Sequence, residues 1–168
     1  MRIGDFVRAD WEANKQNPKG RIVVVLFRMA SWFRTGPAVW RVLGWPYLVG
    51  YRIVVEWVLG IELPPLTSVG PGLALHHGQG LVVNNKVVIG ANCVLRHGVT
   101  LGNKGTEGSD DDCPVLEDGV VIGANAVVLG PIRVGRGAVI GAGAVVLQDV
   151  PAGAVAAGNP ARIVGEGC

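Results

Sequence analysis

The sequence predicts a β-solenoid, a parallel β-helix of hexapeptide repeats, with a small α-helical module before it. Branched aliphatic residues recur every six positions between Gly119 and Val150. All ten aromatic residues lie between Phe6 and Trp57, and glycine, valine and alanine dominate the remainder of the chain. An α-helix would repeat near 3.6 residues and a strand would alternate briefly, whereas a sustained period of six is typical of a parallel β-helix.

The hexad assigns a place to each residue type. The residues expected to point into the coil are Ile122, Val128, Val134, Ile140 and Val146. A glycine follows several of them, because a residue without Cβ lets the chain turn at a corner. Three hexads make one coil, and coils stack at the ordinary inter-strand spacing of about 4.8 Å. No single coil can bury its own interior, so the stack forms the core.

The chain divides into an α-helical N-terminal module, residues 1–61, and a β-helix, residues 62–168. Proline-containing breaks separate the helices expected in the module. The expected helices cover residues 5–13, 21–31, 38–45 and 47–59.

Five arginines interrupt the apolar sequence of this module. The longest uncharged run, Val42 to Tyr51, has ten residues, far fewer than the roughly 20 that a membrane-spanning helix needs. We favour a module that buries its apolar faces on the solenoid and on neighbouring subunits. The alternative is peripheral membrane attachment, with tryptophan and arginine at the level of the headgroups.

Composition excludes several classes of protein. The net charge is +2 and the basic residues are dispersed, which argues against a nucleic-acid partner. The three cysteines have no paired spacing, so we expect reduced thiols and a cytoplasmic protein. Cys93 occupies a small position of its hexad and is expected to be a buried packing residue. The first ten residues carry charges throughout, and we expect no signal peptide.

The hexapeptide pattern is less regular between Val69 and Val115, and the residues that could take part in catalysis lie in this segment. The polar segment from Asn103 to Val115 has no apolar period; such a loop is either a tolerated insertion or part of a binding face. The three histidines fall within 22 residues. His77 and His97 each follow an inward leucine by two positions, so we expect them on one face of successive coils. A histidine of this kind could act as a general base.

Two other kinds of chemistry are open to these residues. A zinc site would need His77, His97 and Cys113 to converge, because adjacent histidines such as His76 and His77 diverge in a strand. Nucleophilic catalysis by Cys113 would need a lowered thiol pKa, whereas the three aspartates before it would raise that pKa. Both interpretations are less favoured.

Together, the hexads, LHHGQG, GVTLG, the polar loop and the ending AAGNPARIVG resemble the serine acetyltransferase branch of the hexapeptide acyltransferases. The resemblance covers residues 60–165 strongly and the N-terminus loosely. It implies a left-handed parallel β-helix, a homotrimer, and acetyl-CoA bound in the groove between adjacent solenoids. No metal is expected.

The resemblance also implies roles for single residues. The catalytic histidine of the family corresponds to His77, and its orienting carboxylate, fifteen residues earlier, corresponds to Glu62. Positions that contact the acceptor correspond to Asn17, His76 and Cys113, and His97 is a second choice for such a contact. The positions implied in coenzyme binding are Gly102, Ala124, Ala142, Ala157, Gly158 and Pro160.

Three departures from the family pattern bear on the acceptor. Serine enzymes carry an acidic residue where this chain has His76, a histidine where it has Cys113, and an acidic residue where it has Asn17. The ammonium group of an amino acid favours carboxylates, so these changes resemble the sugar-modifying members, such as the colanic-acid and exopolysaccharide acetyltransferases.

The sequence therefore predicts an acetyl-CoA-dependent O-acetyltransferase. Its acceptor is expected to be a hydroxyl of a polysaccharide-precursor sugar. Serine O-acetylation in cysteine biosynthesis is the first alternative. A non-catalytic or metal-binding solenoid is the second.

Overall fold

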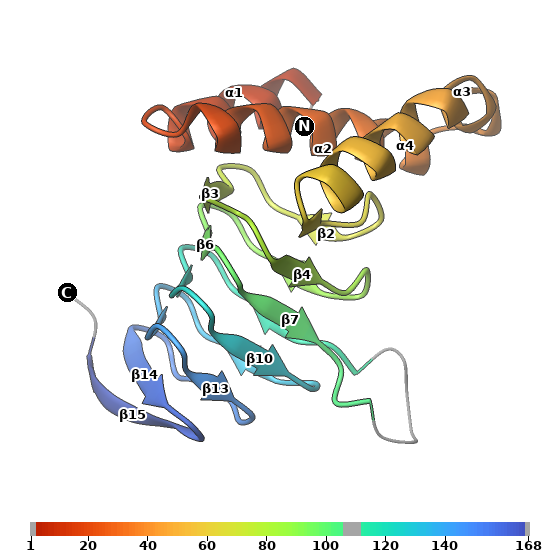
Figure 1. Cartoon of the computed structure of the whole chain (residues 1–168). Helices are drawn as coiled ribbons and strands as arrows, with labels where there is room; N and C mark the ends of the chain where they lie inside the picture. Colours follow the sequence, from red (N-terminus) through yellow and green to blue (C-terminus); the bar gives the residue numbers. More distant parts are fainter. Residues whose placement is uncertain (1–2, 106–111, 167–168) are drawn as a thin grey trace.

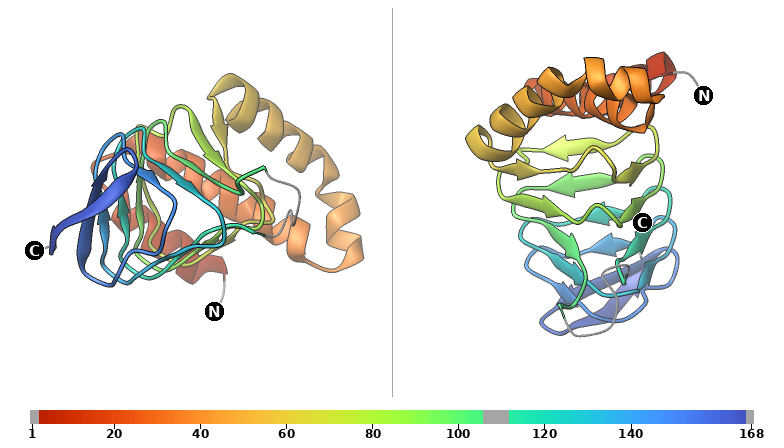
Figure 2. Two further views of the ribbon diagram at one scale, coloured as in Figure 1. Left: turned by 90° about the horizontal axis from the view of Figure 1, so that it is seen from below. Right: turned by 90° about the vertical axis from the view of Figure 1, so that its right-hand side faces the viewer.

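The computed structural model describes residues 3–105 and 112–166. The chain forms a parallel β-solenoid of stacked short strands, and a layer of helices covers one end of the stack (Figure 1). Viewed along the stack, the coils have a roughly triangular outline (Figure 2). The repeat architecture predicted from the period of six is confirmed.

From residue 3 onward, where the description of the chain begins, the helical module contains five segments in chain order. They are α1 (Ile3–Ala13), α2 (Pro18–Thr35), α3 (Ala38–Leu43), α4 (Trp45–Tyr51) and the π-helical η1 (Arg52–Val58). Asn17 caps α2 by accepting a hydrogen bond from the Gly20 amide at 3.1 Å. The break expected between the helices over residues 38–45 and 47–59 is present, but it falls at Gly44. The second helix, α4, already starts at Trp45, because proline is tolerated in the first helical turn.

The strands of the described residues form three sheets, one on each side of the coil, and all of their pairs except the last are parallel. The first sheet contains β1 (Ile61–Glu62), β4 (Leu81–Val83), β7 (Thr100–Gly102), β10 (Val127–Leu129) and β13 (Val145–Val146). The second contains β2 (Ser68–Val69), β5 (Val88–Ile89), β8 (Val115–Leu116) and β11 (Arg133–Val134). The third contains β3 (Ala74–His76), β6 (Val94–Arg96), β9 (Val121–Ile122), β12 (Val139–Ile140), β14 (Ala154–Gly158) and the antiparallel β15 (Ala161–Glu166).

The interior of the coil is the aliphatic ladder. All five inward residues predicted between Ile122 and Val146 are buried, and so is Cys93. The polar loop leaves this core intact, because the register resumes after it: Thr100 pairs with Val127, which in turn pairs with Val145. The strands begin at Ile61, directly after the last helical residues. The division into residues 1–61 and 62–168 stays a prediction.

The helices cover the end of the solenoid and supply hydrogen-bond partners to the unpaired backbone groups of its first strands. A first strand has no neighbour above it, so its amide and carbonyl groups need other partners. Asp10 accepts hydrogen bonds from the amides of Gly72 and Leu73 at 2.8 and 2.9 Å. Asn14 accepts one from the Leu75 amide at 2.9 Å and donates one to the Leu73 carbonyl at 2.7 Å.

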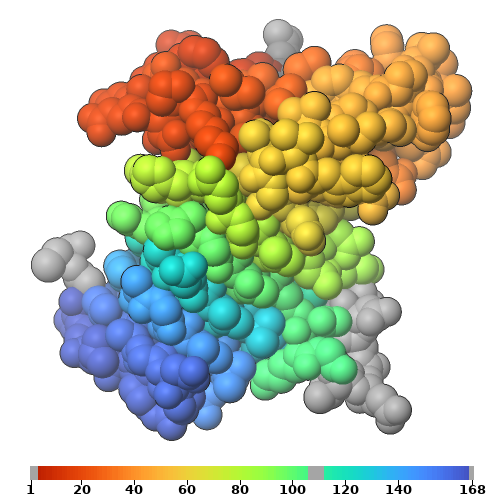
Figure 3. Space-filling model, in the orientation of Figure 1, coloured from red at the N-terminus to blue at the C-terminus, as the bar shows by residue number. Residues whose placement is uncertain are grey.

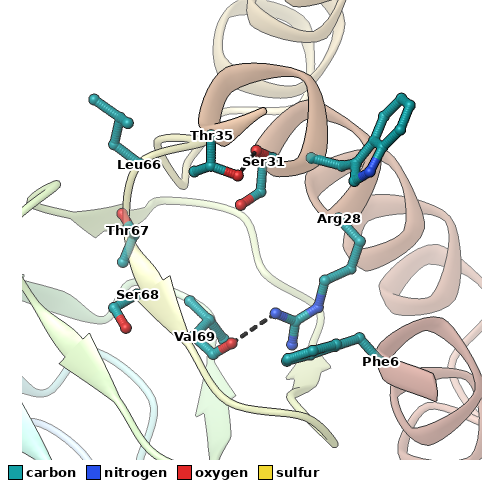
Figure 4. Close-up of a pocket in the computed structure, with 9 residues that line it drawn as sticks. Phe6, Arg28, Ser31, Thr35, Leu66, Thr67, Ser68 and Val69 are labelled. Atoms are coloured by element: carbon teal, nitrogen blue, oxygen red, sulfur yellow. Dashed lines mark hydrogen bonds between the residues drawn. The ribbon is translucent and has the colours of Figure 1, made fainter. Parts of the chain in front are cut away.

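Arg28 completes this closure on the next side of the coil. Its guanidinium pairs with Asp10 at 2.7 Å and donates to the carbonyls of Val69 and Gly70 at 2.6 and 2.5 Å. Figure 4 shows the bond to Val69, with the ring of Phe6 beside the guanidinium. The module is therefore anchored to the solenoid by buried polar contacts as well as by apolar packing.

Candidate active site

His77 and His97 lie together at one corner of the solenoid. Strands β3 and β6 pair in parallel with His76 beside Arg96, so the residue after each strand also aligns. The two rings are 6.0 Å apart between centroids and meet edge to face. This confirms the prediction that the two histidines share a face on successive coils.

The backbone of His77 is unusual for a residue with a side chain. Its φ is +70°, in the left-handed region, and Gly78 follows at +68°. A left-handed residue costs about 1–2 kcal/mol unless it is glycine, and such costs concentrate at functional positions. The turn also exposes the His77 ring at the corner instead of burying it in the coil.

A hollow of about 320 Å³ lies between these histidines and the α1–α2 connection. Its lining comprises Ala13, Asn14, Lys15, Gln16, Asn17, His76 and His77. Asn17 donates a hydrogen bond from its side chain to the Leu75 carbonyl, two residues before His77. The structure thus brings together Asn17, His76 and His77, with His97 directly beside them. No carboxylate is among the described residues that line this hollow.

The electrostatic environment of the hollow is cationic. Lys15 lies in its wall, and Arg96 stands beside His76. Burial lowers the pKa of His76, and the nearby charges of Arg96 and His77 lower it further. His76 is therefore neutral at physiological pH and can accept or donate a hydrogen bond without adding charge.

Several of the small residues predicted to bind the coenzyme lie on later coils, at the same corner of the solenoid as His77 and His97. Asn125 donates its amide proton to the His97 carbonyl at 2.9 Å, and Gly143 donates to the Ala124 carbonyl at 2.8 Å. Ile140 pairs with Ala156, which sets the next residues, Gly141 and Ala157, side by side. One column therefore runs His77, His97, Ala124, Ala142 and Gly158, a length of about 19 Å at the inter-strand spacing.

The remaining coenzyme candidates lie apart from this column. Pro160 lines a hollow of about 330 Å³ together with Leu147 and Arg162 at the far end of the solenoid. Gly102 ends β7 on the first sheet, beside Leu129 of β10. Their assignment to the coenzyme stays a prediction.

Glu62 and Cys113 do not share the hollow with His77. Glu62 is exposed on β1 and forms no hydrogen bond with His77 in the described parts of the chain. It nevertheless starts its sheet near the histidine corner, since a Cβ at Gly78 would lie 3.1 Å from Ile61. Cys113 is buried between β7 and β8, at a different corner. The preceding residues, 106–111, lie outside the described residues.

Within residues 3–105 and 112–166, no three histidine, cysteine or acidic side chains converge in a way that could hold a metal ion. Within one chain, Cys113 lies at another corner of the solenoid than His77 and His97, so a single subunit does not bring the three residues of the zinc alternative together.

Comparison with known proteins identifies relatives over most of the chain. A model described as bacterial transferase hexapeptide (six repeats) matches residues 113–148, and one described as hexapeptide repeat of succinyl-transferase matches residues 81–106. The putative colanic acid biosynthesis acetyltransferase WcaB of Escherichia coli (strain K12) is 38% identical over 161 residues, which are 92% of this chain and 96% of WcaB. The chain belongs to the hexapeptide-repeat, serine acetyltransferase-like family.

Serine acetyltransferases of this family match over part of their length. Serine acetyltransferase 4 of Arabidopsis thaliana is 43% identical over 111 residues, so the chain spans about a third of that relative: 66% of this chain and 31% of the plant protein are covered. The serine acetyltransferase of Brucella abortus strain S19, solved in complex with coenzyme A, superposes with a TM-score of 0.83 at 32% identity. That match covers 98% of this chain and 68% of the other.

Sequence reasoning missed the residues that hold the helices on the first coil, next to the hollow. Asp10 and Asn14 are polar, buried and four residues apart, which places them on one helical face turned toward the first coil. This spacing, with both side chains short and able to bond backbone, was the available signal. The left-handed backbone of His77 had no counterpart in the sequence, because the hexapeptide period does not specify the turn geometry at a corner.

Proposed function

We propose that the protein is an acetyl-CoA-dependent O-acetyltransferase with its active site at the His77–His97 corner. The column of small residues below these histidines supports this assignment, because it offers an unobstructed edge for an extended coenzyme arm. The relatives named acetyltransferases and the coenzyme A complex of the Brucella protein support the same activity.

His77 acts as the general base. Its ring removes the proton from an acceptor hydroxyl as that oxygen attacks the thioester carbonyl, and the same proton then passes to the departing thiolate. A new C–O bond forms as the C–S bond breaks, without an acyl-enzyme, because both substrates are held in one site. We assign Glu62 the role of orienting His77, a contact that can tighten only once substrate is bound.

The acceptor that we propose is a sugar hydroxyl of a polysaccharide precursor. The observation that carries this choice is the hollow beside His76 and His77, whose described lining has a lysine and no carboxylate. An amino-acid ammonium would lack its counter-charge there, whereas sugar hydroxyls match the amides of Asn14, Gln16 and Asn17. The near full-length match to WcaB agrees with this acceptor class.

Serine O-acetylation remains the second candidate, favoured by the solenoid's likeness to serine acetyltransferases. Release of free coenzyme A from acetyl-CoA, followed with a thiol reagent, separates the two. Neutral mono- and oligosaccharides should stimulate thiol release, and serine should not. Rapid turnover with serine alone would reverse this order.

We also propose a cyclic homotrimer in the cytoplasm, with the N-terminal module in contact with a membrane. The histidine corner and the loop corner that bears Cys113 lie at different edges of one solenoid, so a heterologous contact could join the loop edge of one subunit to the histidine edge of the next. Cys93 and Cys113 form no disulfide bond in the described parts of the chain, which suits a reducing compartment. Light scattering of the purified protein tests the trimer.

A further inference from the structure

We infer that an exposed apolar surface on α3, α4 and η1 docks on anionic lipid bilayers. This inference specifies the membrane contact proposed above, and it does not depend on acetyl transfer. We call the feature the α3–η1 surface. Its exposed members are Val39, Trp40, Val42, Leu43, Trp45, Val49, Ile53, Val54, Trp57 and Val58.

The α3–η1 surface exposes more apolar side chains than a helix surface in contact with water usually does. No residue of α3 is buried, although five of its six residues are apolar. Trp45 is 65% exposed, and Val42 and Trp57 are each 73% exposed. This part of the module projects sideways beyond the solenoid (Figures 1 and 3). Exposed apolar side chains gathered on neighbouring helices in this way indicate an interaction site.

The charge of the N-terminal module indicates which kind of partner this surface would bind. Between Glu12 and Glu56 the sequence contains no acidic residue. The basic residues in that interval are Lys15, Lys19, Arg21, Arg28, Arg34, Arg41 and Arg52. Because the whole chain carries only +2, the remainder is net acidic. The positive charge is thus concentrated in the module, and two modules facing each other would repel.

Arg34 and Arg41 are not held in ion pairs by the described parts of the protein. Arg28 is paired with Asp10, and Arg52 with Glu56 at 3.2 Å. Neither Arg34 nor Arg41 forms an ion pair within residues 3–105 and 112–166. Basic residues next to an anionic bilayer each contribute about 1 kcal/mol of binding, so these two arginines fit lipid phosphates.

The apolar and charged groups are interleaved at one place. A hollow of about 480 Å³ is lined by apolar, basic and acidic side chains, which include Trp45, Leu48, Val49, Arg34, Arg52, Glu56 and Glu62. Tryptophan rings and arginines are the side chains that settle at the boundary between headgroups and acyl chains. No helix in the described residues is long and apolar enough to span a bilayer. The surface therefore suits a helix pair lying in the interface.

Co-sedimentation of the full chain with lipid vesicles tests this surface. The protein should pellet with vesicles of phosphatidylcholine mixed with phosphatidylglycerol, and much less with phosphatidylcholine alone. Binding should weaken as NaCl rises, since salt screens exposed charges. Substituting Arg34→Gln and Arg41→Gln together should lower the partition constant about 30-fold. Each arginine contributes about 1 kcal/mol of binding free energy, and about 1.4 kcal/mol corresponds to a tenfold change in the constant.

Matched variants separate this surface from general effects. Trp45→Ala with Trp57→Ala should also reduce binding by on the order of tenfold or more, because apolar burial is lost. Trp11→Ala, an exposed tryptophan of α1, and Arg162→Gln on β15 should leave binding unchanged. All variants should keep the wild-type circular dichroism spectrum.

Two results would overturn the inference. In the first, wild-type protein fails to bind anionic vesicles, or binds both vesicle types equally at high salt. In the second, Trp45→Ala with Trp57→Ala retains vesicle binding but dissociates the oligomer in light scattering, which would make the α3–η1 surface a contact between subunits. Acetyl transfer by the wild-type protein is measured without vesicles and does not depend on either result, so failure here is distinct from failure of the proposed activity.

Discussion

Asp10→Ala tests whether the helical module holds the end of the solenoid in the way the contacts indicate. Asp10 is 1% exposed and pairs with the 7%-exposed Arg28. It also accepts the amides of Gly72 and Leu73. Removing one partner of a buried ion pair costs about 3–5 kcal/mol, because the other charge stays buried. That is a large part of the roughly 5–15 kcal/mol that stabilises a typical protein.

Urea unfolding followed by circular dichroism measures this cost, at one protein concentration because assembly changes apparent stability. We expect a loss of about 4 kcal/mol and a thermal midpoint roughly 8–16 °C lower. The control is Arg136→Gln, which removes an exposed pair with Asp118 at 3.8 Å and should cost less than about 1 kcal/mol. If Asp10→Ala also costs less than about 1 kcal/mol, the capping argument is wrong. Should that variant not accumulate, Asn14→Ala offers a milder test at about 1–3 kcal/mol.

Two further predictions concern the histidine corner. Burial, Arg96 and His77 lower the pKa of His76, so the folded chain binds fewer protons than the unfolded chain. Stability is then complete above the ordinary value of 6.5 and declines as pH falls from there through the lowered pKa. His76→Gln should flatten that decline in urea titrations, and an unchanged slope would rule out His76 as its source. Ala142→Trp should raise the KM for acetyl-CoA without changing the thermal midpoint, because Ala142 is exposed in the proposed coenzyme column; an unaltered KM would remove this column from the coenzyme site.

The period of six was sufficient to predict the solenoid, because stacking makes each inward position equivalent. Ile122 and Val146 are buried for the same reason, four hexads apart. The pairing of His77 with His97 also followed from the hexad phase, since each histidine has the same offset from an inward leucine. Local periodicity thus predicts contacts between successive coils.

Contacts between the module and the solenoid could not be predicted in this way. Asp10 and Asn14 bond the backbone of residues about sixty positions away, and no repeat connects the two segments. The backbone angle of His77 depends on the turn geometry of its coil, which the hexad leaves open. The π-helical turn of η1 and the start of α4 at Trp45 likewise depend on packing against neighbouring helices.

The most direct test of the central claim is the turnover of His77→Asn. Asparagine tolerates the left-handed backbone at this position, so the substitution removes the imidazole without adding strain. Thiol release should be measured with a saccharide acceptor that wild-type protein acetylates, together with coenzyme A binding by calorimetry. The account predicts a kcat lower by about 10²–10⁴, with coenzyme affinity and thermal midpoint unchanged. A kcat near that of wild type would show that the base is not His77 and would contradict the account.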